Sequence, residues 1–306
     1  MNVSVPLFDL NLVFSAGLAV LGLIVGSFLN VVIVRLPHEQ SIVRPRSRCP
    51  SCGHQLAWFE NIPVASWLFL RGRCSSCQAR ISWRYPAVEL ITAILFLASL
   101  YRYGWTWELV IALTLVTLLI PLTFIDLEHW ILPFSLTLPG IAFGLLLSVP
   151  LGWEHLRAAF LGAVLGFLAF WMLEWVGQRI FKKEALGGGD KYLLALLGAF
   201  LGHRSLLGLV FLASIQGAIG GTLLLLVFGR AGPLPAEPKA PVPPAPSPDH
   251  NAEQPTGGEE DDWTPGPHNL PFGPWLSLAG IELMLFGPWL ADRLPFVVAE
   301  WFVGSS

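Results

Sequence analysis

Apolar segments of about twenty residues recur along this chain, and they constrain its fold more than any other feature. A helix that crosses a bilayer needs about 20 mostly apolar residues. In lipid, segments this apolar satisfy their backbone hydrogen bonds as helices. We therefore predict an all-α polytopic membrane protein with about eight transmembrane helices, over residues 10–34, 86–103, 108–127, 131–151, 156–180, 190–203, 205–229 and 273–292.

The composition and the N-terminal residues agree with this class. Of the 306 residues, 54% are hydrophobic and 13% are charged, against about 25% charged residues in a typical soluble domain. The mean hydropathy is +0.62. The first apolar run is too long for the core of a cleavable signal peptide, and no basic stretch precedes it. We predict that this run is retained as the first span.

Arginine and lysine are distributed unevenly among the predicted loops. The segment 35–85 contains eight arginines and only two acidic residues. Because basic residues concentrate in cytoplasmic loops, this segment is predicted to be cytoplasmic and the N-terminus to lie on the other side. Alternating the spans from there puts five more basic residues in the cytoplasm (Arg179, Lys182, Lys183, Arg230 and Lys239) and four arginines opposite (Arg102, Arg157, Arg204 and Arg293).

The polar segments divide the chain into five parts. Residues 231–271 contain twelve prolines and the acidic run 259–262. Because such a composition cannot bury a core, a disordered cytoplasmic linker is predicted. The parts are a first transmembrane helix (1–34), a cytoplasmic four-cysteine domain (35–85), a transmembrane core (86–230), the linker (231–271) and a C-terminal transmembrane segment (272–306).

All four cysteines lie in the predicted cytoplasmic domain, as two C-x-x-C pairs separated by twenty-one residues. Each pair can present two thiolates from one tight turn, and two such turns complete a tetrahedral zinc site. Disulfides rarely persist in the cytoplasm. The alternative is a set of free or redox-active thiols, against which the paired spacing argues. We predict that Cys49, Cys52, Cys74 and Cys77 bind a structural Zn²⁺.

Two aspartates occupy the cytoplasmic ends of different predicted spans. Asp126 ends the third span, and Asp190 begins the sixth directly after Gly187, Gly188 and Gly189. Ionisable groups at membrane depth are functional candidates. Two close carboxyl groups share a proton, so that one can activate water while the other polarises a carbonyl, as in aspartic proteases. The glycines allow close backbone approach. Taken alone, each aspartate could instead be an interfacial or capping residue.

Other polar residues interrupt the apolar runs. Glu89 in the second span could line a cleft beside the aspartates or form a hydrogen bond between helices. For Asn30 in the first span, packing is the favoured interpretation. Glu174 and Glu282 are weaker candidates, because both could pair locally.

The order of motifs along nearly the whole chain resembles the prepilin peptidases, which are GxGD-type membrane aspartic proteases. Gly189-Asp190 with Leu193 to Gly202 resembles their second catalytic motif. The other matching stretches are 26–37 (first span), 60–74 and 81–89 (cytoplasmic domain), 125–139 (first catalytic motif) and 271–274 (last spans).

This resemblance implies two activities at a bacterial inner membrane. The enzyme would remove the basic leader of type IV prepilins or type II secretion pseudopilins after a glycine. It would then methylate the new N-terminus with S-adenosylmethionine. Asp126 and Asp190 would be catalytic, with Gly188, Gly189, Lys191 and Glu89 supporting the active site. The cysteines would bind Zn²⁺, the arginine-rich domain would support methylation, and the active site would face the cytoplasm.

Two positions depart from the family pattern. Many relatives have a lysine two residues after the second catalytic aspartate, whereas here Lys191 follows directly and Tyr192 takes that place. Phe134 stands where relatives often have an aspartate.

A proton-coupled transporter and a non-enzymatic secretion scaffold remain alternatives, although no internal repeat is visible. Partners are expected to be prepilin substrates and lipid, not nucleic acid.

Overall fold

The computed structural model describes residues 7–181, 187–228, 270–293, 299 and 301–302. It divides into two compact units, Met1–Gln216 with Pro271–Ser306, and Gly217–Leu270; the two aspartates and the four cysteines belong to the first. The predicted linker falls almost entirely outside the described residues. The α-helices are α1 (Leu7–Arg35), α2 (Ala65–Phe69), α3 (Arg84–Tyr103), α4 (Trp107–His129), α5 (Phe134–Ser148), α6 (Trp153–Phe181), α7 (Asp190–Leu201), α8 (Leu206–Phe228) and α9 (Gly273–Ala291).

The all-α polytopic fold is confirmed. Within the described ranges, seven helices are long and apolar enough to cross a membrane: Leu12–His38, Arg84–Tyr103, Trp107–His129, Phe134–Leu151, Trp153–Ile180, His203–Val227 and Gly273–Ala291.

The segment expected as a sixth span, residues 190–203, differs from a full span. Helix α7 has 12 residues, which corresponds to about 18 Å, against a hydrocarbon core of about 30 Å. Leu193 to Ala199 are all buried. Protein therefore surrounds this short helix where a full-length span would meet lipid.

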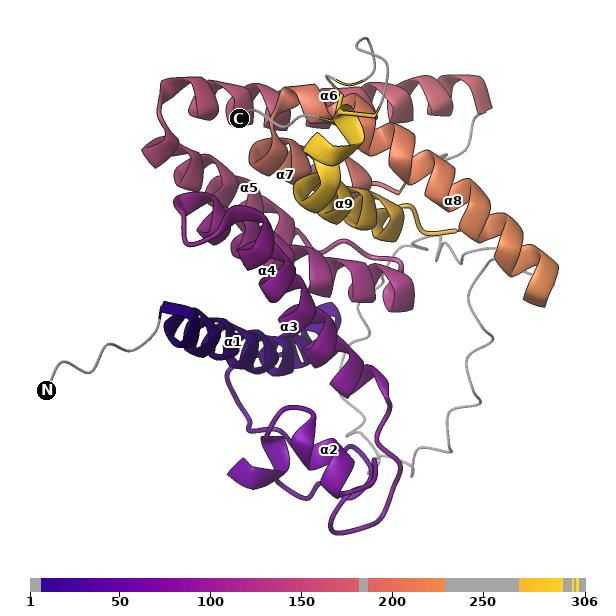
Figure 1. The fold of residues 1–306 in the computed structure, drawn as a ribbon. Helices are drawn as coiled ribbons and strands as arrows, with labels where there is room; N and C mark the ends of the chain where they lie inside the picture. The colour runs from indigo at the N-terminus through magenta and orange to yellow at the C-terminus, as the bar shows by residue number, and fades with distance from the viewer. Residues whose placement is uncertain (1–6, 182–186, 229–269, 294–298, 300, 303–306) are drawn as a thin grey trace, which may run out of the picture. The chain divides into compact units, whose positions relative to one another are not determined.

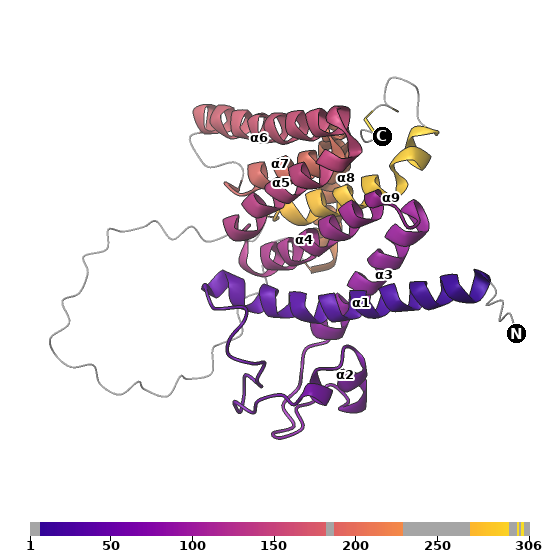
Figure 2. The ribbon, with the colours of Figure 1, turned by 90° about the vertical axis from the view of Figure 1, so that its left-hand side faces the viewer.

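Helices α1 and α3 form a long pair at one side of the unit (Figure 2). Gly22 and Gly26 of α1 lie directly against the backbone of Ala93 and Glu89 of α3. Small residues at such contacts let two membrane helices approach closely.

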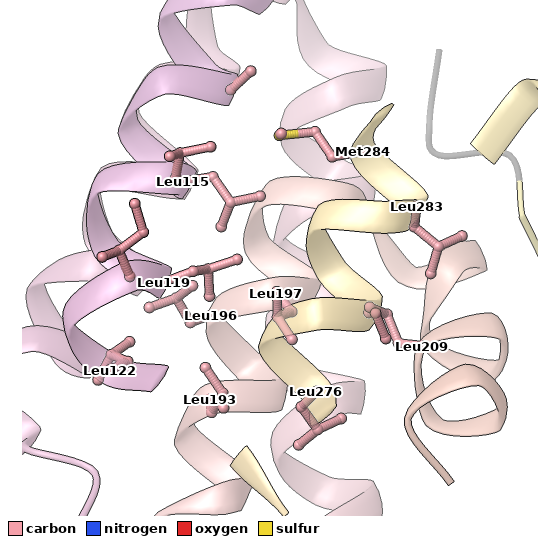
Figure 3. Packing of buried hydrophobic residues seen from close by; sticks show 14 of the residues in the cluster. Leu115, Leu119, Leu122, Leu193, Leu196, Leu197, Leu209, Leu276, Leu283 and Met284 are labelled. Carbon is pink, nitrogen blue, oxygen red and sulfur yellow. The ribbon is translucent and has the colours of Figure 1, made fainter. Parts of the chain in front are cut away.

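The apolar core lies between α4, α7 and α9. Leu115, Leu119 and Leu122 of α4 face Leu193, Leu196 and Leu197 of α7, with Leu276, Leu283 and Met284 of α9 beside them (Figure 3). All of these side chains are buried. The core thus fixes α4 and α7 relative to one another, and these helices carry the two candidate aspartates.

Helix α6 packs closely along α7. Gly162 and Gly166 of α6 meet the α7 backbone at Gly198 and Leu194, and a Cβ atom at Gly162 or Gly198 would overlap the carbonyl oxygen of the other. The outward faces carry many exposed large apolar side chains, such as Leu168, Trp171 and Met172 of α6. A bilayer is the environment that such surfaces require.

The segment between α1 and α3 is built from short elements. It contains the 3₁₀ helices Leu36–His38 and Trp58–Asn61, the helix α2, and two antiparallel bridges, Arg48 with Gln55 and Arg73 with Arg80. Figure 1 shows this segment apart from the core of α4, α7 and α9.

Candidate active site and metal centre

Asp126 lies in the last turn of α4, and its residue is only 6% exposed. The backbone N–H of Gly273, the first residue of α9, forms a hydrogen bond with its carboxyl group. A methyl group at position 273 would overlap this carboxyl group. The start of α9 therefore closes one side of the Asp126 position.

Asp190 is the first residue of α7 and is also 6% exposed. Its backbone N–H donates to the carbonyl oxygen of Gly187 at 3.1 Å, so the glycine turn leads directly into the helix. The Asp190 carboxyl group interacts electrostatically with that of Asp126. Two buried carboxyl groups from different helices thus lie near one another at the expected end of α4 and α7.

Leu132 lies close to two backbone positions beside this pair, Gly189 and Gly273. A Cβ atom at Gly189 would lie 2.7 Å from the Leu132 Cβ, and one at Gly273 would lie 3.4 Å from its Cδ1. Leu132 is 8% exposed. It is therefore a buried apolar neighbour of both Gly189, next to Asp190, and Gly273, which bonds to Asp126. Neither aspartate has an ion-pair partner in the described part of the chain.

The predicted supporting residues lie in different surroundings. Gly189 contacts Leu132, whereas a Cβ atom at Gly188 would have nothing within 4 Å. The Nζ atom of Lys191 lies 2.7 Å from the Oε2 atom of Glu174 on α6. Lys191 therefore has a carboxylate partner of its own, and it ties the start of α7 to α6.

Glu89 is 7% exposed, and its contacts are with α1 and the cysteine segment. Its Oε2 atom accepts a hydrogen bond from the backbone N–H of Val64 at 2.7 Å, and the Ser27 hydroxyl also bonds to it. The nearby Asn30 donates to the carbonyl oxygen of Tyr85 at 3.0 Å. These contacts match the interhelical alternative for both residues, and they also dock the cysteine segment on α3.

An aromatic cluster that sequence reasoning did not identify follows Asp190. The Tyr192 ring makes edge-to-face contacts with Phe134 at 4.9 Å and with Phe167 at 5.4 Å between centroids. Tyr192 and Phe134 are the two positions that depart from the family pattern. Their direct contact shows that the two departures lie at one place, which only the helix packing reveals.

The four cysteines converge. Their sulfur atoms all lie within 4.8 Å of one another, with Cys49 to Cys77 at 3.8 Å and Cys52 to Cys74 at 4.0 Å. In a tetrahedral site with Zn–S bonds of about 2.3 Å, sulfur atoms lie about 3.8 Å apart. The donor set therefore fits Zn²⁺, and four protein ligands leave no open position for catalysis.

Two similar tight turns present the cysteines. The N–H of Gly53 donates to the Cys49 carbonyl at 2.9 Å, and the N–H of Gln78 donates to the Cys74 carbonyl at 3.1 Å. Both Gly53 and Gln78 have positive φ, 71° and 60°. Backbone N–H groups of Cys52 and Ser51 hydrogen-bond to the Cys49 sulfur and lower its pKa to about 6. This favours the thiolate, which is the form that binds metal.

Glu60 joins the two turns. Hydrogen bonds from the Ser75 hydroxyl, the Ala57 N–H and His54 hold the pKa of this carboxyl group below its usual range. The Nε2 atom of His54 lies 3.1 Å from it. Because Ser75 belongs to the second cysteine pair and His54 follows the first, ionised Glu60 stabilises the cluster from outside.

Glu128, two residues after Asp126, has a basic partner within the chain. Its carboxylate lies 2.5 Å from Arg84 at the start of α3. This ion pair neutralises Glu128 and connects the ends of α3 and α4.

Two family models match the chain. The bacterial peptidase A24 N-terminal domain matches residues 20–103, and the type IV leader peptidase family matches residues 113–222. A prepilin leader peptidase/N-methyltransferase of Myxococcus xanthus is 53% identical, over 95% of this chain and 96% of that protein. Proteins of the same name from Neisseria gonorrhoeae and Aeromonas hydrophila are 40% and 37% identical, over 69% and 87% of this chain and 82% and 88% of theirs. No solved structure matches.

Proposed function

The chain belongs to the type IV leader peptidase family, and from this premise we propose that it is an aspartic endopeptidase that removes the leader of type IV prepilins or pseudopilins. The observation that carries the mechanism is the buried pair formed by Asp126 and Asp190, whose carboxyl groups interact across α4 and α7. Prepilin processing as such follows from the three relatives described above, each named prepilin leader peptidase/N-methyltransferase.

The two carboxyl groups divide the chemistry between them. Because two buried carboxyl groups near one another cannot both ionise easily, they hold one proton between them. The ionised group takes a proton from water, and the protonated group donates a hydrogen bond to the scissile carbonyl. The Gly273 N–H holds the Asp126 carboxyl group, and the burial of both aspartates limits water around the pair. Either aspartate can act first as the base in this scheme.

We place this site at the cytoplasmic face. The arginines of residues 35–85 support that side for the C-terminal end of α1, and α4 and α7 carry the aspartates at the end reached by alternating the spans. A substrate whose apolar helix stays in lipid would then present its basic leader to the cytoplasm. The scissile bond falls at the interface, where water is available.

The second activity is N-methylation of the new N-terminus, as in the names of the relatives. S-adenosylmethionine would supply the methyl group. The sequence contains no glycine-rich nucleotide loop of the soluble methyltransferases, so we assign no residue to that cofactor. We assign Zn²⁺ to Cys49, Cys52, Cys74 and Cys77, where it would hold the two turns together.

The test is intact mass spectrometry of a cognate pilin co-produced with this protein. The unaltered protein is expected to yield pilin that lacks its leader and carries one added methyl group. Asp126→Asn and Asp190→Asn are each expected to leave the leader in place, with a rate loss of at least about 10⁴-fold, as for other groups that act as a unit.

Asp292→Asn is the matched control, because this aspartate is exposed just after α9. It should process pilin at the normal rate. Leader removal that persists in either variant of the buried pair would refute the assignment of that residue. If the unaltered protein yields pilin that is cleaved but not methylated, the peptidase assignment stands and the methyltransferase assignment is refuted.

A further inference from the structure

A surface cavity in the cysteine segment is not used by the proposed chemistry. Its volume is about 610 Å³. Three arginines and two tryptophans supply most of its lining: Trp67, Arg71, Arg73, Arg80 and Trp83.

The walls of this cavity are held in place by the backbone. The Trp67 indole N–H donates to the carbonyl oxygen of Ile81 at 3.2 Å, and its ring packs on Gly72, where a Cβ atom would lie 2.9 Å from the ring. Gly72 has φ of 64°, a conformation that favours glycine. The cavity is therefore a built feature of the segment and does not depend on exposed side chains alone.

The arginines of the cavity lack a counter-charge. Arg73 and Arg80 stand opposite one another in an antiparallel bridge, where like charges are destabilising. Arg71, Arg73 and Arg80 have no acidic partner in the part of the chain that the structure describes. An anion in the cavity would relieve this repulsion.

The cavity lies beside a membrane-spanning helix. Trp83 immediately precedes α3. Val64, just before α2, is bonded to Glu89, which lies five residues into α3, or about 7 Å along its axis. Helix α2 then presents Leu68 and Phe69, which are 61% and 87% exposed. These side chains are thus anchored close to the start of α3, which is one end of a candidate membrane span (Arg84–Tyr103).

We propose that this cavity binds the phosphate-bearing headgroup of an anionic phospholipid, while Leu68 and Phe69 enter the adjoining acyl region. Arginine and tryptophan at a bilayer surface suit this partner. The other ligands of the enzyme suit the cavity poorly. A pilin leader is basic, and S-adenosylmethionine carries a sulfonium and an ammonium group against a single carboxylate, so the net positive charge of both is disfavoured beside three arginines.

The test is native mass spectrometry of the full-length protein in detergent, titrated with phosphatidylglycerol or neutral phosphatidylcholine. The unaltered protein is expected to bind phosphatidylglycerol preferentially. Combining Arg71→Gln, Arg73→Gln and Arg80→Gln should weaken that binding about a hundredfold, since each basic residue contributes about fivefold. The control combines Arg44→Gln, Arg46→Gln and Arg48→Gln, which removes equal charge from exposed positions outside the cavity; its binding should stay within about fivefold of normal.

A second variant tests the proposal independently, in case the triple arginine variant fails to fold. Leu68→Gln with Phe69→Gln keeps the charges and is expected to weaken phosphatidylglycerol binding about tenfold or more, by loss of two exposed apolar anchors. Equal losses in both arginine variants, or no loss in either cavity variant, would overturn the proposal. Displacement of the lipid by an equimolar amount of soluble glycerol phosphate would also overturn the proposal. Binding of S-adenosylmethionine that is lost in the cavity variants would overturn it as well. None of these readouts depends on leader cleavage, so the proposal can fail while the proposed function stands.

Discussion

The Asp126 carboxyl group lies against a backbone position that has no side chain. Gly273 donates its N–H to the carboxyl group, and there is no room for a methyl group between them. On the other side, Leu132 leaves a similarly narrow space beside Gly189, next to Asp190. Among the described residues, small side chains and one leucine surround the two aspartates, and no basic side chain pairs with them.

This crowding predicts the effect of Gly273→Ala. The added methyl would displace the Asp126 carboxyl group or the start of α9. A shift of about 1 Å in a catalytic group typically costs about 100-fold in rate. We expect leader removal to slow by about that factor, measured as the initial rate of cleavage of a purified prepilin in detergent.

Gly17→Ala serves as the control, since it also adds one methyl to a helical glycine but has nothing within 4 Å of the new atom. It should cleave at the normal rate. A Gly273→Ala protein as active as the control would mean that the Asp126 position tolerates displacement, contrary to a tightly held pair.

Helix α7 is short, buried and closely packed against α6. It is too short to span a bilayer alone, it is buried along most of its length, and Asp190 is its first residue. Its close approach to α6 at Gly162 and Gly198 sets how near it lies to its neighbours. The Lys191–Glu174 ion pair fixes its first turn to the same helix.

Gly198→Ala is expected to separate α6 from α7, because the new Cβ atom would overlap the Gly162 carbonyl. Overpacking of this kind costs about 1–3 kcal/mol. We expect a lower midpoint of thermal unfolding and reduced leader cleavage. Leu168 lies on the outward face of α6 and is 44% exposed. Leu168→Ala should therefore change neither the midpoint of unfolding nor the cleavage rate much. If Gly198→Ala kept both the normal midpoint and the normal rate, the contact would have no role in placing Asp190.

Hydropathy was sufficient for much of this arrangement. The long spans, the paired cysteines and the two aspartates are local patterns in the sequence, and each is readable without a fold. The bounds of α7 were also close to expectation, residues 190–203 against Asp190–Leu201, but its counting as a transmembrane span was not, because its residues are as apolar as those of a full span.

Contacts between distant segments were also hidden. Glu89 is polar within an apolar run, but its partner Val64 belongs to a different segment. Leu132 and Gly273 lay within stretches noted for their family resemblance, yet nothing in those stretches indicated that Gly273 contacts Asp126 or that Leu132 lies against Gly189. Side-chain neighbours of this kind depend on helix packing, which periodicity does not encode.

Taken as a whole, the described chain combines a membrane part and a cysteine segment that are stabilised differently. The membrane part has a continuous apolar core between α4, α7 and α9 (Figure 3). In the cysteine segment, the buried hydrophobic residues of 36–83 are only Cys49 and Cys74. A segment this size with so little apolar core requires a staple such as a metal.

Removal of the metal should therefore unfold one part and spare the other. Structural zinc sites contribute about 10–16 kcal/mol of apparent binding energy in small peptides, which is far more than the few hydrogen bonds that hold this segment. We expect chelation, or Cys74→Ser, to raise amide hydrogen exchange throughout residues 47–82 while the leucine core of α4 and α7 stays protected. Ser76→Ala, in the same turn but without a ligand atom, should leave exchange unchanged. Protection of residues 47–82 that survives complete loss of metal would show that the four cysteines do not stabilise the segment through a metal, and the Glu60 contacts would then have to suffice.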